Sequence, residues 1–226
     1  MISAVKAGSA ELSAKVEEAD RVREGIDLDY VLSDIGSVVT ESIEGADRVS
    51  KIVADLRDFS HVDSPDMTVA DINELIEKTL RVAANELKYK ADVVTELGDV
   101  PAIPCFGGKL RQVFLNLFVN AAQAIEERGT VTVRSGHQDG QVWIEVADTG
   151  SGIPEENLTK VFDPFFTTKA VGSGTGLGLH LSFKIIEAHG GRISADSQVG
   201  QGSTFRIELP VSGPPKTKEA RVEQAA

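Results

Sequence analysis

The chain has 226 residues and a formal net charge of -12 at pH 7. This charge argues against nonspecific binding to nucleic acid or to anionic lipid, because both carry negative charge. The single cysteine, Cys105, excludes an internal disulfide and any site with several cysteine ligands. The longest apolar stretch, residues 113–125, is interrupted by three amides and is too short to span a bilayer. No signal peptide is visible in the first residues. We expect this segment to lie in the cytoplasm without membrane contact of its own, either in a soluble protein or as the cytoplasmic part of a larger membrane-bound one.

Residues 1–66 are predicted to form an antiparallel helical hairpin. Their apolar residues recur every three or four positions from Ile35 to Phe59, and more weakly over residues 2–22. Residues 25–29 would connect the two helices. Because two helices cannot bury such stripes alone, we expect a homodimer in which two chains complete a four-helix bundle. The alternative is that the hairpin packs against the globular part of its own chain.

Residues 67–212 are predicted to form one globular domain, in which helical and alternating patterns follow each other. The expected elements are a helix capped by Asp71, a strand at 93–97, a helix at 108–127, a hairpin of strands at 130–134 and 142–147, a helix at 177–189, and strands at 192–195 and 204–209. Together they indicate an α/β (α+β) sandwich, with a mixed sheet and helices on one face. Residues 213–226 are rich in Pro, Lys and Glu, which predicts a disordered tail.

Three polar or glycine-rich segments follow one another in this domain. Asn116 and Asn120 lie four residues apart on one face of an apolar helix, where amides need polar partners. Asp148 precedes two alternate glycines, which is typical of a strand that ends in a tight turn. Residues 172–178 place glycines before a helix N-terminus, which suits phosphate binding. Neither a P-loop nor a Rossmann glycine pattern is present. Ordinary turn glycines would explain one segment, but the order of all three favours a nucleotide site.

These segments resemble the sensor histidine kinases of the GHKL ATPase/kinase superfamily over residues 68–212. The matching motifs are the N box at Asn116-x-x-x-Asn120-Ala, the first glycine box at Asp148-x-Gly150-x-Gly152, the F box at 162–166, the second glycine box at 174–179 and the last turn of the domain at 200–205. The resemblance implies a Bergerat-type ATP-binding fold. It also implies that residues 1–66 are part of the dimerisation and phosphotransfer hairpin.

The resemblance implies ATP (or ADP) and Mg²⁺ as ligands. Asp148 would accept a hydrogen bond from the exocyclic amine of adenine, which guanine lacks at that position. Asn120 would bind Mg²⁺, and Asn116 would support the metal or the phosphates. Lys169, in a segment that resembles the family's mobile lid, would contact phosphate, because Gln123 stands where many members have a basic residue. The other residues expected to bind ATP are Gly150, Gly152, Ile153, Phe165, Gly174, Thr175, Gly176, Leu177, Gly178 and Thr204.

The resemblance also indicates which reaction to expect. Asn116 stands where the hydrolases of the superfamily have a glutamate base, and an amide cannot take a proton from water, so kinase activity is favoured over hydrolysis. The family's acceptor histidine precedes an acidic residue, and no His-Glu or His-Asp pair occurs here. We therefore expect transfer of the ATP γ-phosphoryl group to a histidine outside this segment, for relay to a response-regulator receiver domain. The alternative is a non-catalytic, nucleotide-gated dimerisation and interaction module.

Overall fold

The computed structural model describes residues 2–25, 27–60, 67–169 and 174–215. The chain divides into two compact units, residues 1–51 and residues 52–226, and each is described by itself. Residues 61–66, which include His61, lie outside the described residues, as does most of the predicted tail, from residue 216 onward.

Two long helices, α1 (Ile2–Gly25) and α2 (Leu28–Ser60), lie where the sequence predicts helical segments, and they meet within the predicted connection at residues 25–29. Asp27 begins α2: its carboxylate accepts from the backbone N–H of Tyr30 at 3.4 Å, and its carbonyl accepts from that of Val31 at 3.0 Å. This arrangement satisfies backbone groups that a helix start leaves unpaired. The antiparallel arrangement of the two helices stays a prediction.

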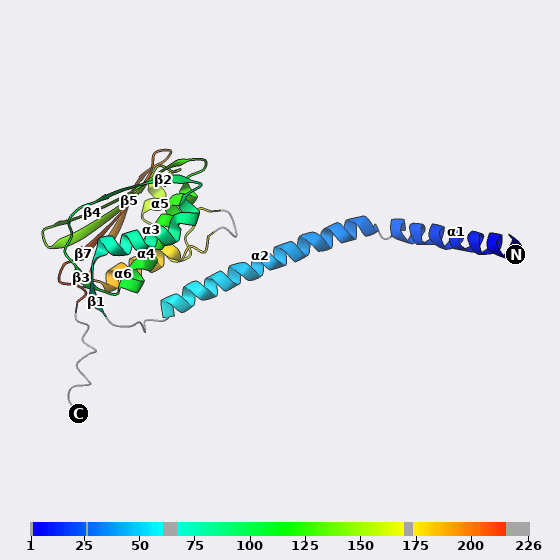
Figure 1. Ribbon diagram of the computed structural model, residues 1–226, viewed down its shortest axis with the longest axis horizontal. Coiled ribbons are helices and arrows are strands. Elements are labelled where there is room, and N and C mark those ends of the chain that lie inside the picture. The colour runs from blue at the N-terminus through cyan, green and yellow to red at the C-terminus, as the bar shows by residue number, and fades with distance from the viewer. Residues whose placement is uncertain (1, 26, 61–66, 170–173, 216–226) are drawn as a thin grey trace, which may run out of the picture. The chain divides into compact units, whose positions relative to one another are not determined.

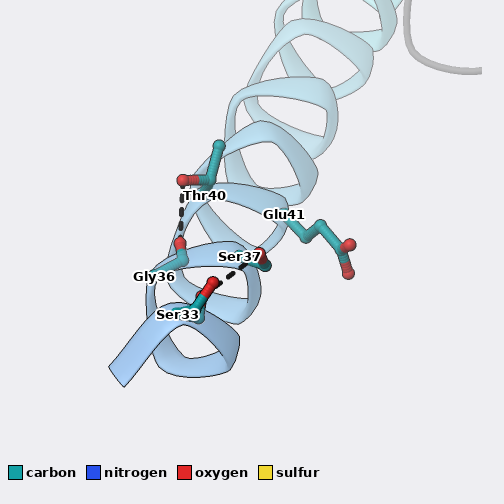
Figure 2. A pocket seen from close by; sticks show the side chains of 5 residues that line it. All are labelled: Ser33, Gly36, Ser37, Thr40 and Glu41. Atoms are coloured by element: carbon teal, nitrogen blue, oxygen red, sulfur yellow. Dashed lines mark hydrogen bonds between the residues drawn. The ribbon is translucent and has the colours of Figure 1, made fainter. Parts of the chain in front are cut away.

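The two faces of α2 differ sharply in side-chain character. The predicted apolar stripe is exposed along the single chain, including Ile35, Val38, Val39, Ile43, Val49 and Val53. The small residues Ser33, Gly36, Ser37 and Thr40 lie together on one face (Figure 2), and helical spacing places that face opposite the apolar stripe. There the hydroxyls of Ser37 and Thr40 donate to carbonyls one turn earlier, at 3.3 and 2.9 Å. One face is therefore suited to burial, and the other already satisfies its own polar groups.

The globular domain contains a five-stranded mixed sheet in the order β2-β4-β5-β7-β6. Its strands are β2 (Ala91–Leu97), β4 (Gly129–Gln138), β5 (Gln141–Asp148), β6 (Arg192–Gln198) and β7 (Gly202–Pro210). Only β2 and β4 pair in parallel, and the other neighbours are antiparallel. The β4–β5 turn has positive φ at both Asp139 and Gly140, the conformation that an Asp-Gly pair favours in a two-residue hairpin. The mixed sheet predicted from the sequence is confirmed.

Helices α3 (Ile72–Leu87), α4 (Gly107–Ala124) and α6 (Gly178–Ala188) pack together on one face of this sheet (Figure 1). Asp71 caps α3 as predicted, because its carboxylate accepts from the backbone of Asn73 at 2.8 Å and of Glu74 at 3.3 Å. The core lies between the helices and the sheet, and it is formed by fully buried side chains such as Ile72, Ile76, Leu110, Phe114, Leu117, Phe118, Ile144, Ile186 and Ile207. Helix α4 lies between α3 and α6 in this layer and packs against both.

Three short elements were not expected from the sequence. A two-stranded antiparallel sheet joins β1 (Thr68–Ala70) to β3 (Ile103–Cys105), and α5 (Glu155–Leu158) is a single helical turn. Elements of three or four residues are too short to show a period of apolar positions. Near the β1–β3 sheet, Gly213 lies against Pro104, so the chain still packs on the domain just beyond residue 212.

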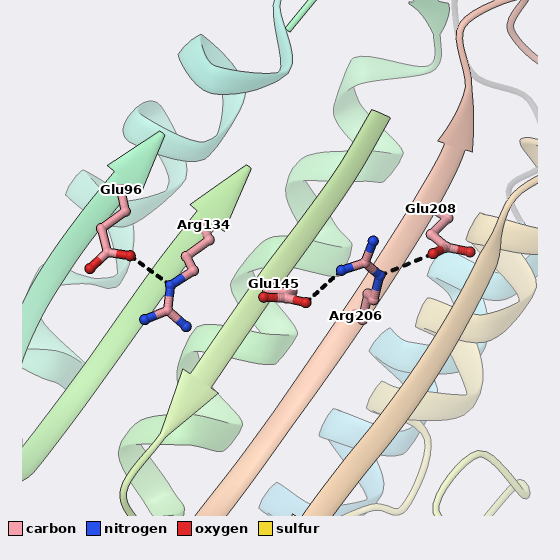
Figure 3. Close-up of polar contacts among 5 residues, drawn as sticks. All are labelled: Glu96, Arg134, Glu145, Arg206 and Glu208. Atoms are coloured by element: carbon pink, nitrogen blue, oxygen red, sulfur yellow. Dashed lines mark hydrogen bonds and ion pairs between the residues drawn. The ribbon is translucent and has the colours of Figure 1, made fainter. Parts of the chain in front are cut away.

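The face of the sheet opposite the helices carries paired charges (Figure 3). Glu96 pairs with Arg134 at 2.6 Å, and Arg206 lies between Glu145 at 2.6 Å and Glu208 at 3.0 Å. The Arg206 guanidinium also lies 5.0 Å from the centre of the Trp143 ring. Exposed ion pairs contribute about 0–1 kcal/mol each. This face is therefore polar and carries paired charges of both signs, while the helix-covered face holds the core and the candidate site.

Candidate nucleotide-binding site

Asp148 is the last residue of β5 and is 7% exposed. Its Oδ1 accepts from the backbone N–H of Gly150 at 2.8 Å. Burial raises the pKa of the Asp148 carboxyl above its usual range, and hydrogen bonds from the backbone of Gly150 and Ser203 act in the opposite direction. A buried carboxylate that is held in place in this way favours a ligand with an amine donor, such as adenine, over one with a carbonyl at the same position, such as guanine.

Ser203, and not Thr204, shares the sheet face of Asp148. In the β5–β7 register Asp148 is opposite Ser203, whereas Thr204 is opposite Ala147 and points to the other face. The Ser203 hydroxyl is buried and lies 3.0 Å from that of Ser197, which accepts from the backbone N–H of Ile153 at 2.8 Å. The structure therefore places Ser203, and not the predicted Thr204, on the same sheet face as Asp148.

The two glycines after Asp148 make room for protein backbone. A Cβ on Gly150 would lie 2.5 Å from the carbonyl oxygen of Ala124, at the end of α4, and one on Gly152 would lie 2.2 Å from that of Gln198. Gly152 also has φ of 73°, which side chains rarely adopt. The Ser151 N–H donates to the Ala124 carbonyl at 2.9 Å. These glycines thus hold the first glycine box against the end of α4 and the β6–β7 turn.

Asn116 joins α4 to the start of α6. Its amide Nδ2 donates to the Gly178 carbonyl at 3.2 Å and lies 3.5 Å from the Ser182 hydroxyl, which itself donates to the same carbonyl at 2.9 Å. A Cβ on Gly178 would lie in ordinary contact with the Asn116 side chain, at 3.7 Å. Asn116 therefore positions the second glycine box directly.

Asn120 and Gln123 bring two amide oxygens to one cation. The Lys169 ammonium donates to Asn120 Oδ1 at 3.0 Å and to Gln123 Oε1. Side-chain amide oxygens are hard donors of the kind that Mg²⁺ accepts alongside waters and phosphate oxygens. Because a cationic group already lies on Asn120 Oδ1 in the structure, the chemistry of this position fits the predicted metal ligand. Among the described residues there is no cluster of three or more His, Cys, Asp or Glu side chains that could hold a metal by itself.

The second glycine box and the F box meet in one tight contact. The Phe165 N–H donates to the Gly176 carbonyl at 3.0 Å, and a Cβ on Gly176 would lie 2.4 Å from the Phe165 backbone. Phe165 has φ of 66° and an exposed ring, whereas Leu177 is buried, and its N–H donates to the Thr175 hydroxyl at 3.4 Å. Gly174 lies close to the side chains of Thr167 and Lys169. The predicted residues on either side of the undescribed stretch 170–173 thus lie together at the start of α6.

The histidines of the domain do not gather at this site. The His189 ring is 2% exposed; its Nε2 accepts from the Phe106 N–H at 3.1 Å, and its Nδ1 donates to the Ile185 carbonyl at 2.7 Å. His180 Nδ1 lies 2.9 Å from the Phe162 carbonyl, and His137 is exposed beside a hairpin turn. His189 and His180 thus make contacts with backbone groups of the domain, and His137 is exposed. In the described part of the chain, no helix has the length and apolar character of a membrane span.

The comparisons with known proteins agree with this geometry. Residues 107–213 match the family of histidine kinase-, DNA gyrase B- and HSP90-like ATPases. The chain is 37% identical to the sensor histidine kinase ZraS of Escherichia coli K12 over 169 residues, which are 74% of this chain and 36% of ZraS. It therefore spans about a third of that relative's length.

Solved histidine kinases have the same fold. The nucleotide-free catalytic domain of the histidine kinase ThkA is 34% identical, with a TM-score of 0.59 over 66% of this chain and 97% of that chain. ThkA in complex with the response regulator TrrA is 27% identical, with a TM-score of 0.61 over 74% and 49%. Full-length ShkA in complex with AMPPNP is 27% identical, with a TM-score of 0.66 over 78% and 39%. The chain therefore belongs to the histidine kinase-, DNA gyrase B- and HSP90-like ATPases and carries the ATP-binding catalytic domain of a two-component sensor histidine kinase.

Proposed function

We propose that this chain binds Mg-ATP and transfers the γ-phosphoryl group to a histidine outside the segment, for relay to a response-regulator aspartate. The observation that carries the proposal is the order of groups along α4. The loop after Asp148 contacts Ala124 at one end, Asn120 lies one turn earlier, and Asn116 contacts Gly178 at the other end. Eight residues of α-helix rise about 12 Å, which suits a nucleotide lying along the helix with adenine at Ala124 and phosphates at Gly178.

The proposed roles follow from this order. Asp148 accepts from the adenine amine, with Ser203 beside it on the same sheet face. Asn120 Oδ1 binds Mg²⁺, which neutralises phosphate charge when bound. The backbone N–H groups at the start of α6 face the phosphates, because a helix N-terminus attracts anions. Asn116 positions that helix start and offers no base to activate water, so transfer to an acceptor is favoured over hydrolysis.

We also propose two partners. The apolar stripe of α2 is exposed in one chain, which supports a homodimer through residues 1–66. ThkA was solved in complex with the response regulator TrrA, and this supports a receiver domain as the second partner. Residues 67–212 would act as the catalytic unit, in the cytoplasm where ATP and receiver domains are found.

Phosphoryl transfer is tested by incubating the chain with γ-labelled ATP, alone and with a dimerisation-helix fragment that carries an acceptor histidine. Alone, the chain should show little acid-labile label and slow phosphate release. With the fragment, label should appear on the acceptor histidine; Asn120→Ala should abolish the transfer, and Asp99→Ala, in an exposed loop, should not.

Two outcomes would contradict this proposal. Strong labelling of the isolated chain at His61 would make His61 the acceptor. Nucleotide binding without transfer to any supplied acceptor would instead favour a non-catalytic module gated by nucleotide.

A further inference from the structure

Lys169 is held by two residues of one helix face. Its ammonium donates to Asn120 Oδ1 at 3.0 Å and to Gln123 Oε1, and both acceptors lie on α4 three residues apart. The Gln123 side chain is exposed, and it is neutral. A basic residue at position 123 would place a second cation within hydrogen-bond distance of the first and would repel Lys169. A hydrogen-bond acceptor without positive charge is therefore required at position 123 for this arrangement.

In the function proposed above, Asn120 Oδ1 binds Mg²⁺, whereas in the structure the same oxygen accepts from Lys169. A carbonyl oxygen can bind Mg²⁺ or accept from an ammonium, but the two cations repel each other strongly at such short range. Lys169 must therefore leave Asn120 before Mg²⁺ binds there. Gln123 lies one turn further along α4 and can keep its contact with Lys169 after this exchange.

We propose that Gln123 is a positioning residue that holds Lys169 on Asn120, so that the Lys169 ammonium and Mg²⁺ are alternative cations at Asn120 Oδ1. The inference rests on the proposed function for the role of Mg²⁺, but not for the contact itself. It assigns Gln123 a role in setting the Mg²⁺ concentration that the site needs.

The contact is tested by tryptic cleavage of the nucleotide-free protein after Lys169, because a lysine held on α4 cannot enter the protease pocket. Gln123→Leu should speed cleavage at this bond about three-fold or more, a modest effect because the contact is exposed. Cleavage after Lys88, on the exposed turn after α3, should not change. Gln123→Glu keeps an acceptor and should restore slow cleavage after Lys169. Equal rates after Lys169 in wild type and Gln123→Leu would overturn the proposal.

The competition is tested by calorimetry of ADP binding over a range of Mg²⁺ concentrations. Gln123→Leu and Lys169→Met should both lower the half-saturating Mg²⁺ concentration, by about three-fold or more. An effect of Lys169→Met without one of Gln123→Leu would mean that Lys169 acts only on phosphates, and would overturn the proposal. A wild type that binds no Mg-nucleotide would contradict the proposed function instead, and the cleavage rates would still decide whether Gln123 holds Lys169.

Discussion

The ring of His189 accepts a hydrogen bond from the backbone N–H of Phe106 at 3.1 Å, and so joins the end of α6 to the residue that precedes α4. The two rings also meet edge to face, with centroids 5.5 Å apart. The Phe106 N–H is one of the groups that a helix start leaves unpaired, and a buried histidine 83 residues away satisfies it. The contact fixes the ring as the neutral tautomer with hydrogen on Nδ1, because Nε2 must accept.

This contact predicts a loss of stability in mild acid. Burial lowers the pKa of His189 below its usual value of about 6.5. The unfolded chain therefore takes up the proton first, and the stabilisation is full above pH 6.5 and is lost as the pH falls below it. Urea unfolding of the wild type should show a lower free energy of unfolding at pH 5.5 than at pH 7.5.

Substitution of His189 tests the same contact. His189→Phe should cost about 1–3 kcal/mol at pH 7.5, because the Phe106 N–H loses its buried acceptor. It should also show a smaller difference between the two pH values than the wild type. His137→Ala, at an exposed ring, should keep the wild-type difference. An unchanged pH dependence in His189→Phe would contradict the assignment.

Adenine selectivity is predicted to depend on Asp148. A hydrogen bond to a charged group is worth about 1.5–3 kcal/mol, so Asp148→Ala should weaken ATP binding roughly 10- to 150-fold. The wild type should bind GTP far more weakly than ATP, because the buried carboxylate would face a carbonyl. Calorimetry checks both statements, with Asp99→Ala as the exposed control. Equal affinities for ATP and GTP would remove Asp148 from this role.

Features that depend on residues close together in the chain could be predicted from the sequence. Periodicity located every long helix, and the capping position of Asp71 was correct because it is decided by its next three residues. Contacts between distant segments were not accessible in this way. Lys169 and Gln123 are 46 residues apart and belong to elements whose packing no local pattern describes.

Register explains why Ser203, and not the predicted Thr204, shares the sheet face of Asp148. Alternation along a strand shows that successive residues face opposite sides, but not which of them faces the helices. Only the pairing of β5 with β7 shows that Ser203 lies opposite Asp148 and that Thr204 does not. A motif alignment alone cannot separate two adjacent hydroxyl residues.

Two matched substitutions test Ser203 against Thr204. Ser203→Val should weaken ADP binding about ten-fold, because it adds bulk beside Asp148 and removes the hydroxyl that meets Ser197. Thr204→Val should stay within about two-fold, because that side chain points to the other face of the sheet, where valine is a good strand former. Circular dichroism would show that both variants fold. Weaker ADP binding by Thr204→Val, with unchanged binding by Ser203→Val, would show that Thr204 and not Ser203 contributes to nucleotide binding.

Dimerisation is predicted to depend on one face of α2. Val49 and Val53 are 59% and 57% exposed in the single chain, and together with their neighbours they form an apolar stripe too long for a lone helix in water. The double variant Val49→Glu, Val53→Glu should be monomeric by light scattering at micromolar concentration and should still bind ATP, because both positions lie on α2 and none of the proposed catalytic residues does. Ser33→Glu with Thr40→Glu places the same charges on the opposite face (Figure 2) and should leave the dimer intact. A wild type that is monomeric under these conditions, or equal disruption by both pairs, would show that the apolar stripe is not the dimer interface.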